Sequence, residues 1–177
     1  MANEFELDVS RIRADARAHM AQGPVTEGYQ ADKKRVIEIL NDVVATEIVC
    51  FLRYSQHAIA ATGIDRTQVA AEFREHARAE MDHGLRAAER ISQLGGKADF
   101  DPATLAARSH TEYVETDEND LRRMLQENLV AERIVITSYQ EIIRWLGDTD
   151  PTTRRLMESI LAEEEEHADD LTDLLAK

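Results

Sequence analysis

Apolar residues recur every three or four positions through most of the chain, the spacing that places them on one face of an α-helix. The pattern predicts a short amphipathic helix that follows Ser10 as its N-cap and ends at Gly23-Pro24. Four long helices should follow. The first spans about 31–61, the second runs from a cap at Asp65 or Thr67 to Gly95-Gly96, and the last two span about 118–146 and 151–174. Glycine or a capping aspartate stands near most of these boundaries, so we predict an all-α fold.

The connection between the second and third long helices is about 20 residues long, from Lys97 to Thr116. It is too long for a tight hairpin, whereas the other two connections are short. Within it, Asp101-Pro102 followed by Ala-Thr-Leu-Ala-Ala predicts a short helix with proline at its first position. We therefore predict a four-helix bundle over residues 31–177 with one long crossover, preceded by an N-terminal extension at residues 1–30.

The composition narrows the possible partners. The net charge of −14 comes from 35 acidic and 21 basic residues, so we expect the chain to attract cations and to bind neither nucleic acid nor anionic membranes. No apolar run approaches the roughly 18 residues of a membrane span. The single Cys50 cannot form an intrachain disulfide, which predicts a cytoplasmic protein in which Cys50 is a small buried side chain.

Two Glu-x-x-His motifs stand out, at Glu80–His83 and Glu164–His167. Each follows a single glutamate inside an apolar helical run, 33 residues upstream in the first half and 32 in the second. Together they supply four carboxylates and two imidazoles: Glu47, Glu80, His83, Glu132, Glu164 and His167. Two single glutamates combined with two such motifs are a known pattern of di-iron and di-manganese helical bundles.

The positions of these residues explain why metal is expected. Residues three apart on a helix share a face about 5–6 Å apart, so Glu80 and His83 can bind the same ion. In the acidic run 163–166, only Glu164 has this relation to His167, and the other three glutamates are interpreted as solvated or as support for the ligands. Four ionised glutamates on apolar faces would be very unfavourable alone, but two divalent ions would balance their charge. Mixed carboxylate and imidazole ligands suit iron or manganese better than structural zinc.

Several other side chains lie near the expected centre. Tyr54 and Tyr139 each follow a single glutamate by two helical turns. They could hydrogen-bond a ligand or donate an electron, or simply fill the core. His76 lies one turn before Glu80 on the same face, and it is either an accessory iron ligand or a histidine that supports the centre or lies on the surface. His57 points away from the predicted ligand face and is interpreted as structural.

From Leu40 to Leu175 the chain resembles the ferritin superfamily, and bacterioferritins most of all, through Glu47 with the segment 53–58 and through both Glu-x-x-His motifs. The resemblance implies terminal ligands Glu47 and Glu132, bridging carboxylates Glu80 and Glu164, and nitrogen ligands His83 and His167. It also implies that two iron ions per subunit (or manganese) react with O2 or H2O2, and that ferric iron is stored in a protein cage. Met81 stands where bacterioferritins bind haem b.

The ends of the chain differ from bacterioferritin. Only ten residues follow His167, so no fifth helix is expected, and an N-terminal extension and a crossover helix are added. These features resemble the Dps-type mini-ferritins, which form twelve-subunit shells but build their usual iron site between subunits. The whole chain is therefore most similar to Dps-like proteins with a bacterioferritin-type site inside each subunit. Known members of that group carry a cysteine pair near the site, whereas this chain has one cysteine.

Two other functions are compatible with the residues. A closed di-metal catalase or peroxidase of the same fold would use the same ligands, although the chain is short for a manganese catalase and lacks the four cysteines of a rubrerythrin-type peroxidase. A metal-free helical interaction module would have to keep its four apolar-face glutamates protonated or turned into solvent.

Overall fold

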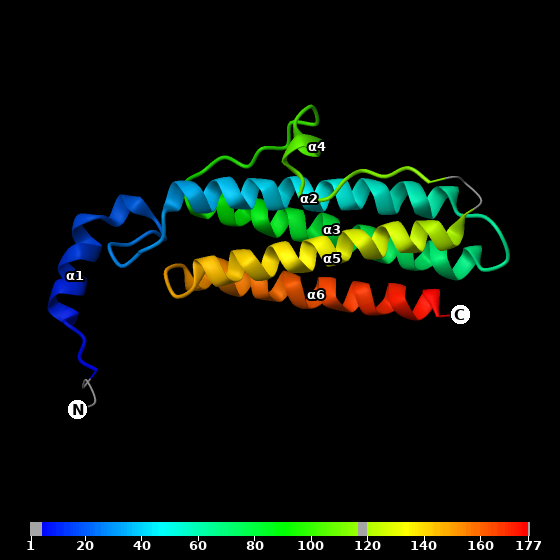
Figure 1. Cartoon of the computed structure of the whole chain (residues 1–177). Coiled ribbons are helices and arrows are strands. Elements are labelled where there is room, and N and C mark those ends of the chain that lie inside the picture. The colour runs from blue at the N-terminus through cyan, green and yellow to red at the C-terminus, as the bar shows by residue number, and fades with distance from the viewer. Residues whose placement is uncertain (1–4, 117–119, 177) are drawn as a thin grey trace.

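The computed structural model describes residues 5–116 and 120–176, and every regular element in those ranges is a helix. The long helices α2 and α3 pack as one hairpin, α5 and α6 pack as a second, and the two hairpins lie side by side (Figure 1). Their bounds are α2 Lys33–Ala60, α3 Arg66–Gln93, α5 Leu121–Leu146 and α6 Pro151–Leu175. The shorter elements are α1 Val9–Ala18, the 3-10 helix η1 Met20–Gln22 and α4 Leu105–Arg108. The predicted all-α bundle with one long crossover is confirmed, and within the described ranges no helix follows α6.

Aspartate side chains cap three of the four long helices. Asp32, Asp120 and Asp150 each accept a hydrogen bond from the backbone N–H three residues later, at 3.1, 2.9 and 2.9 Å. Each bond satisfies a donor that has no partner within the helix. The predicted start of the third long helix, Glu118, lies outside the described residues.

Three predicted details of the short helices were wrong. The N-terminal helix was expected to reach Gly23-Pro24, but α1 ends at Ala18 and only the 3-10 helix η1 follows it, to Gln22. The other two details concern where a helix begins, and in both a nearby aspartate explains the difference. The N-terminal helix is capped by Asp8, whose carboxylate accepts the N–H of Arg11 at 3.0 Å, so Ser10 already lies inside the helix. In the crossover, Asp101 accepts the N–H of Ala103 at 3.0 Å and holds a turn there. The short helix α4 consequently begins three residues later than Pro102, at Leu105.

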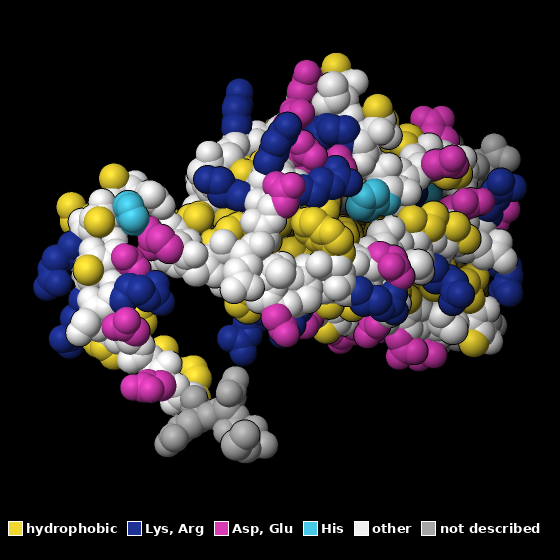
Figure 2. Space-filling model, turned by 60° about the vertical axis from the view of Figure 1, so that its left-hand side comes forward, with side chains coloured by type: hydrophobic (Ala, Val, Ile, Leu, Met, Phe, Trp, Pro, Cys, Tyr) yellow, Lys and Arg dark blue, Asp and Glu magenta, His cyan; other side chains and the backbone are white. Residues whose placement is uncertain are grey.

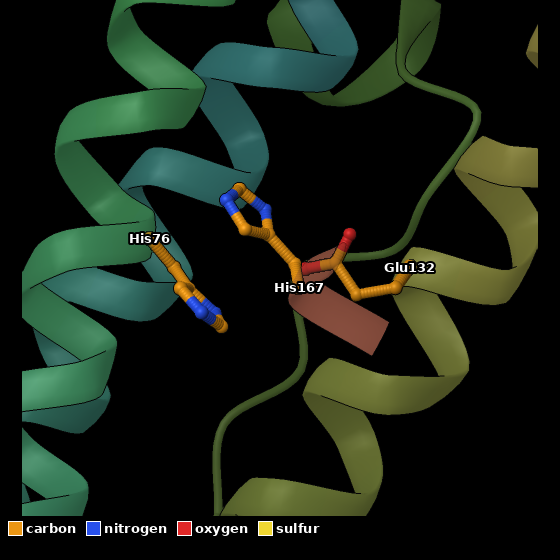
Figure 3. Close-up of side chains that lie close together, drawn as sticks. All are labelled: His76, Glu132 and His167. Atoms are coloured by element: carbon orange, nitrogen blue, oxygen red, sulfur yellow. The ribbon is translucent and has the colours of Figure 1, made fainter. Parts of the chain in front are cut away.

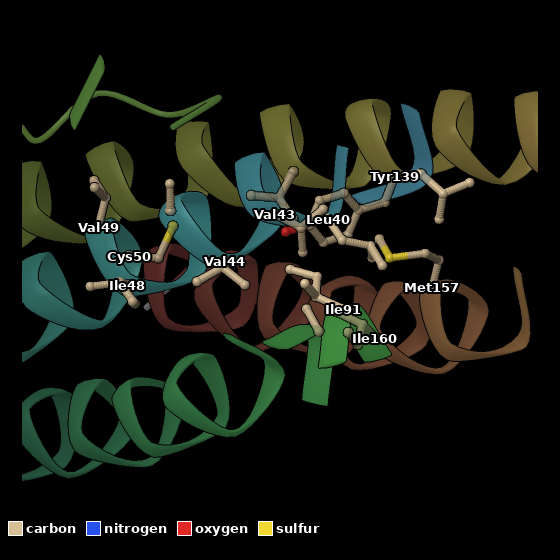
Figure 4. Packing of buried hydrophobic residues seen from close by; sticks show 14 of the residues in the cluster. Leu40, Val43, Val44, Ile48, Val49, Cys50, Ile91, Tyr139, Met157 and Ile160 are labelled. Carbon is tan, nitrogen blue, oxygen red and sulfur yellow. The ribbon is translucent and has the colours of Figure 1, made fainter. Parts of the chain in front are cut away.

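Buried apolar side chains form two clusters at different levels of the bundle. The first, shown in Figure 4, joins α2 before and around Cys50 to the parts of α3, α5 and α6 nearest the α5–α6 turn. The second surrounds Tyr54 and Phe73 and includes Met124, Leu125 and Leu171. On α3, α5 and α6 the predicted ligand glutamates and histidines lie between residues of the two clusters, and on α2 Glu47 lies among residues of the first cluster. The apolar levels exclude water on both sides and hold these polar groups in place.

Helix α1, in the N-terminal extension, stands away from the bundle. Helix α1 buries none of its residues, and Figures 1 and 2 show it projecting beyond one end of the four long helices, with apolar side chains on its surface. Elsewhere Figure 2 shows acidic and basic side chains intermixed on the outside of the bundle. None of the helices in the described ranges has the length and apolarity needed to cross a membrane.

Asp150 joins the extension to the bundle. It is buried, receives hydrogen bonds from Tyr29 Oη at 2.9 Å and Thr153 N at 2.9 Å, and pairs with Arg90 at 3.1 Å. Burial alone would raise the pKa of Asp150, but the bonds from Thr153 and Tyr29, with the charge of Arg90, outweigh it and lower that pKa. The charged form is therefore the one that the folded protein favours.

We expect Asp150→Asn to lower the free energy of unfolding by about 2 kcal/mol, because a helix cap and the partner of the buried Arg90 are both weakened. Urea unfolding at pH 7 measures this loss. Since the folded-state pKa lies below the unfolded one, the difference between wild type and variant should shrink as the pH falls below about 4. Equal stability of the two proteins at pH 7 would contradict the assignment.

Candidate metal centre

The six predicted ligands meet at one level of the bundle. Glu47 comes from α2, Glu80 and His83 from α3, Glu132 from α5, and Glu164 and His167 from α6. The four glutamates and His83 are fully buried, and His167 keeps only 7% exposure. Each helix therefore contributes ligands to one enclosed site, because the i, i+3 spacing turns both members of each motif inward.

The six side chains fall into two overlapping sets of four. One contains Glu47, Glu80, His83 and Glu164, and the other Glu80, Glu132, Glu164 and His167. Within each set the ligand atoms lie within 4.8 Å of one another. Glu80 and Glu164 belong to both sets, as carboxylates bridging two ions would. The assignment of terminal and bridging ligands stays a prediction. It requires that Glu80 and Glu164 lie close to both ion positions, and the two sets have this property.

The unsatisfied atoms of the site fit metal ions. Both carboxylate oxygens of Glu80, one oxygen each of Glu47, Glu132 and Glu164, and Nδ1 of His167 are buried without a hydrogen-bond partner. His167 Nδ1 lies 3.3 Å from an oxygen of Glu80 and from one of Glu164. Unpaired buried oxygens are strongly unfavourable, and cations bound between them would remove that cost. The donor set of carboxylates and imidazoles suits iron or manganese.

Without metal, protons and one ion pair must balance the buried charges. Burial raises the pKa of Glu80 and of Glu132 well above the usual value, and neighbouring carboxylates raise both further. Burial acts against charge on Glu164 and His83 too, but the contacts of Glu164 with His167 and His83 lower its pKa to about 2. The contacts of His83 with Glu164 and Glu47 raise the pKa of His83 to about 11. Metal binding must therefore displace protons from the centre.

Each of the two tyrosines hydrogen-bonds a glutamate from the other half of the chain. Tyr54 donates a hydrogen bond to Glu132, and Tyr139 donates one to Glu47. Each tyrosine therefore contacts the single glutamate from the opposite half of the chain. Both tyrosines are also buried in the core. Of the roles considered for the tyrosines, the structure shows hydrogen bonding. The two bonds orient the carboxylates of Glu132 and Glu47.

Glu163, which pairs with Arg86, fixes the ring of His83 on the side away from the centre. Nε2 of His83 lies 3.0 Å from Glu163, and Arg86 donates to the other oxygen of Glu163 at 2.9 Å. The ring thereby presents Nδ1 to the centre, 2.8 Å from Glu164. A carboxylate behind a metal-binding histidine commonly fixes its tautomer and orientation. Of the two roles considered for Glu163, solvated residue or support for the ligands, the structure shows the second.

A buried polar network that the sequence analysis missed supports the other side of the site. Arg53 donates to Asn128 Oδ1 at 2.9 Å and to the backbone oxygen of Glu112 at 2.9 Å, which ties the crossover to the bundle. Asn128 Nδ2 lies 2.9 Å from His57. Burial and the nearby arginine lower the pKa of His57 to about 4. His57 is structural, and the signal for Asn128 was its position one helical turn before Glu132.

A glycine allows α2 and α3 to approach each other at this level. A Cβ placed on Gly84 would lie 3.3 Å from Cβ of Glu47. Such a contact is tighter than ordinary packing, so a larger residue would push the two helices apart. Gly84 follows His83 directly, and its small size helps to set the distance between the ligands of α2 and α3.

His76 is buried beside the centre and is not a surface residue. Its ring stacks on that of His167, with centroids 4.1 Å apart, and its Nδ1 lies 3.2 Å from Tyr54 Oη. Figure 3 shows His167 between His76 and Glu132. Burial and the neighbouring His167 lower the pKa of His76 to about 3. Met81, on the same helix, is half-buried, and haem binding there stays a prediction.

Cys50 is buried in the first apolar cluster, where it lies 3.5 Å from Thr111 Oγ1 and from Arg53. Burial raises the pKa of this thiol to about 12. We therefore expect Cys50 to be almost unreactive towards an aromatic disulfide reagent at pH 8 in the folded protein. Unfolding in guanidinium should release one reactive thiol per chain, and equally fast labelling before unfolding would contradict this expectation.

Residues 37–177 match the ferritin-like domain family. A solved structure, the bacterioferritin-related dodecameric thioferritin from Bacteroides fragilis, is 34% identical and has a TM-score of 0.79, covering 83% of this chain and 88% of its own. A bacterioferritin from Desulfovibrio desulfuricans is 29% identical over 150 residues, covering 69% of this chain and 84% of its own.

A third relative is relevant to the prediction that this chain does not bind nucleic acid. The nutrient stress-induced DNA-binding protein of a Synechococcus species is 28% identical over 145 residues, covering 80% of this chain and 81% of its own. That similarity gives no support to the expectation that this chain excludes nucleic acid. The expectation rests on the net charge of −14 alone and stays a prediction.

Proposed function

Because the chain belongs to the ferritin-like family, we propose that it is a ferroxidase, which oxidises Fe(II) with O2 or H2O2 at a dinuclear site inside each subunit and stores or detoxifies the iron in an oligomeric shell. One observation carries the proposal. The two buried four-residue sets share Glu80 and Glu164, and their unpaired oxygens face one another. Iron is the substrate here, although manganese would suit the same ligands.

The shared carboxylates explain how the site would favour two-electron chemistry. Glu80 and Glu164 would hold two Fe(II) ions close together, so that one oxidant takes one electron from each ion. With H2O2, two electrons and two protons give two water molecules. With O2, they give one H2O2. Tyr54 and Tyr139 would keep Glu132 and Glu47 oriented while the charge of the ions rises.

The proposal includes assembly into a twelve-subunit shell. The dodecameric relative from Bacteroides fragilis supports it, as do the apolar residues that a single chain leaves exposed. Examples on the extension and the bundle are Phe5, Met20, Ile59, Ile64 and Trp145. Light scattering on the purified protein should give a mass twelve times that of one chain. A monomer mass at micromolar concentration would contradict the shell.

An aerobic Fe(II) titration tests the function. Soluble ferric absorbance is followed against the number of iron ions added per chain, with buffer alone as the control. A signal that grows well beyond two ions per chain without precipitation is the expected result for a storage shell. Saturation at two ions would instead indicate a closed centre, and catalase and peroxidase assays with iron and manganese would then follow.

A further inference from the structure

A second group of possible ligands lies at the edge of the bundle, next to the dinuclear site. Glu72 and His76 on α3 and Asp170 on α6 place one ligand atom each within 4.8 Å of one another. His76 Nε2 lies 3.4 Å from an oxygen of Glu72 and 3.6 Å from one of Asp170. This group, which we call the edge cluster, is built from two helices and combines two carboxylates with one imidazole.

The imidazole of the edge cluster is buried and points at the carboxylates. Only 2% of the His76 side chain is exposed, against 28% for Glu72 and 48% for Asp170. Its Nδ1 faces Tyr54 at 3.2 Å, but its Nε2 is buried without a hydrogen-bond partner. A buried ring nitrogen left in this state is unfavourable, and a cation bound to it would remove the penalty.

The distances are close to those of a coordinated ion. Imidazole and carboxylate ligands bind transition metals at about 2.0–2.2 Å, so two ligands at tetrahedral or octahedral angles stand about 3.0–3.5 Å apart. The His76–Glu72 separation falls in this range, and the His76–Asp170 separation exceeds it by only about 0.1 Å. The two carboxylates balance one divalent charge, and the exposed side of Asp170 leaves room for water to complete the coordination.

His76 also connects the edge cluster to the dinuclear site. Its ring stacks on that of His167, and a further set of mutually close ligand atoms contains His76, Glu132 and His167 (Figure 3). An ion leaving the edge cluster would therefore meet two proposed ligands of the dinuclear site next. The cluster lies on the α3–α6 side, whereas the crossover is held to α2 and α5 through Arg53 and Asn128, on the opposite side of the bundle.

We propose that Glu72, His76 and Asp170 form a third, mononuclear site for a divalent transition-metal ion, which takes up Fe(II) from solvent and supplies it to the dinuclear site. The proposal that a metal ion binds here rests on the edge cluster alone. The supply of iron rests on the proposed ferroxidase function.

Zinc binding to the full-length assembled protein tests the site directly. Calorimetric titration with Zn(II) should give three ions per chain for wild type and two for the double variant E72Q/D170N. The matched control E75Q/D169N changes exposed neighbours on the same helices and should keep all three. Anomalous scattering from zinc-soaked crystals should place one ion about 2.0–2.1 Å from His76 Nε2. Equal stoichiometry in E72Q/D170N and wild type, or no anomalous peak beside His76, would overturn the site.

Iron kinetics separate this proposal from the ferroxidase proposal. At low Fe(II), E72Q/D170N should oxidise iron about tenfold more slowly than wild type and the control variant, because the dinuclear site loads more slowly. At saturating Fe(II) the three proteins should differ by less than about twofold. Loss of one zinc with unchanged kinetics at low iron would refute the supply role and leave the ferroxidase intact. If E72Q/D170N binds one zinc fewer and the wild type oxidises no iron at all, the ferroxidase proposal is refuted and the edge site stands.

Discussion

Replacing Glu80 by alanine is expected to slow rapid Fe(II) oxidation by about a hundredfold or more, while the helices stay folded. Glu80 is fully buried, belongs to both four-residue sets, and has both carboxylate oxygens without a hydrogen-bond partner. Its removal would therefore weaken both ion positions at once. Loss of a group that only supports a metal ligand commonly costs 10–100-fold in activity, so loss of a shared ligand should exceed that range.

The measurement is stopped-flow ferric absorbance with two Fe(II) ions per chain, with circular dichroism to check helix content. The matched control is Glu89→Ala, which removes an exposed glutamate from the same helix and should leave the rate unchanged. Only Glu80 and Glu164 belong to both four-residue sets. A wild-type rate in Glu80→Ala would therefore disprove the assignment of the centre.

Binding of a divalent metal that O2 does not oxidise is expected to raise the melting temperature of the iron-free protein by about 10 °C. Four glutamates and two histidines share one buried level, and several of their atoms have no partner until a cation is present. Free ligand at about a thousand times its dissociation constant stabilises a folded protein by about 4 kcal/mol. For a chain of this length, each kcal/mol raises the melting temperature by about 2–4 °C.

Differential scanning calorimetry with and without Zn(II) measures the effect, and removing the metal with a chelator should reverse it. Glu80→Ala should show less than half of the increase, whereas Glu89→Ala should show all of it. The pKa values of Glu80 and Glu132 are raised, so protons compete with metal more strongly at lower pH. The increase should therefore be smaller at pH 6 than at pH 8. An increase that is the same at both pH values would contradict proton displacement.

Much of the architecture could be predicted because it depends on local spacing. The four long helices follow from the periodicity of apolar residues, and the start of the last one follows from Asp150 and Pro151. The six candidate ligands were found in the same way. A glutamate on an apolar helical face must point into the core, and a histidine three residues later shares that face. The predictions that failed concerned where short helices begin and end. Asp8, not Ser10, caps α1, which ends before Gly23, and α4 begins after Pro102.

What depends on contacts between distant segments was decided only by the tertiary structure. The spacing places each tyrosine two turns after its own glutamate, yet Tyr54 binds Glu132 and Tyr139 binds Glu47. The pairing of His76 with Asp170 and that of Arg53 with Asn128 are of the same kind. The sequence by itself determines which face of a helix a side chain occupies, since that face depends on residue number. Its partner across the core depends on how the helices pack, because packing alone sets the rotation and height at which two of them meet.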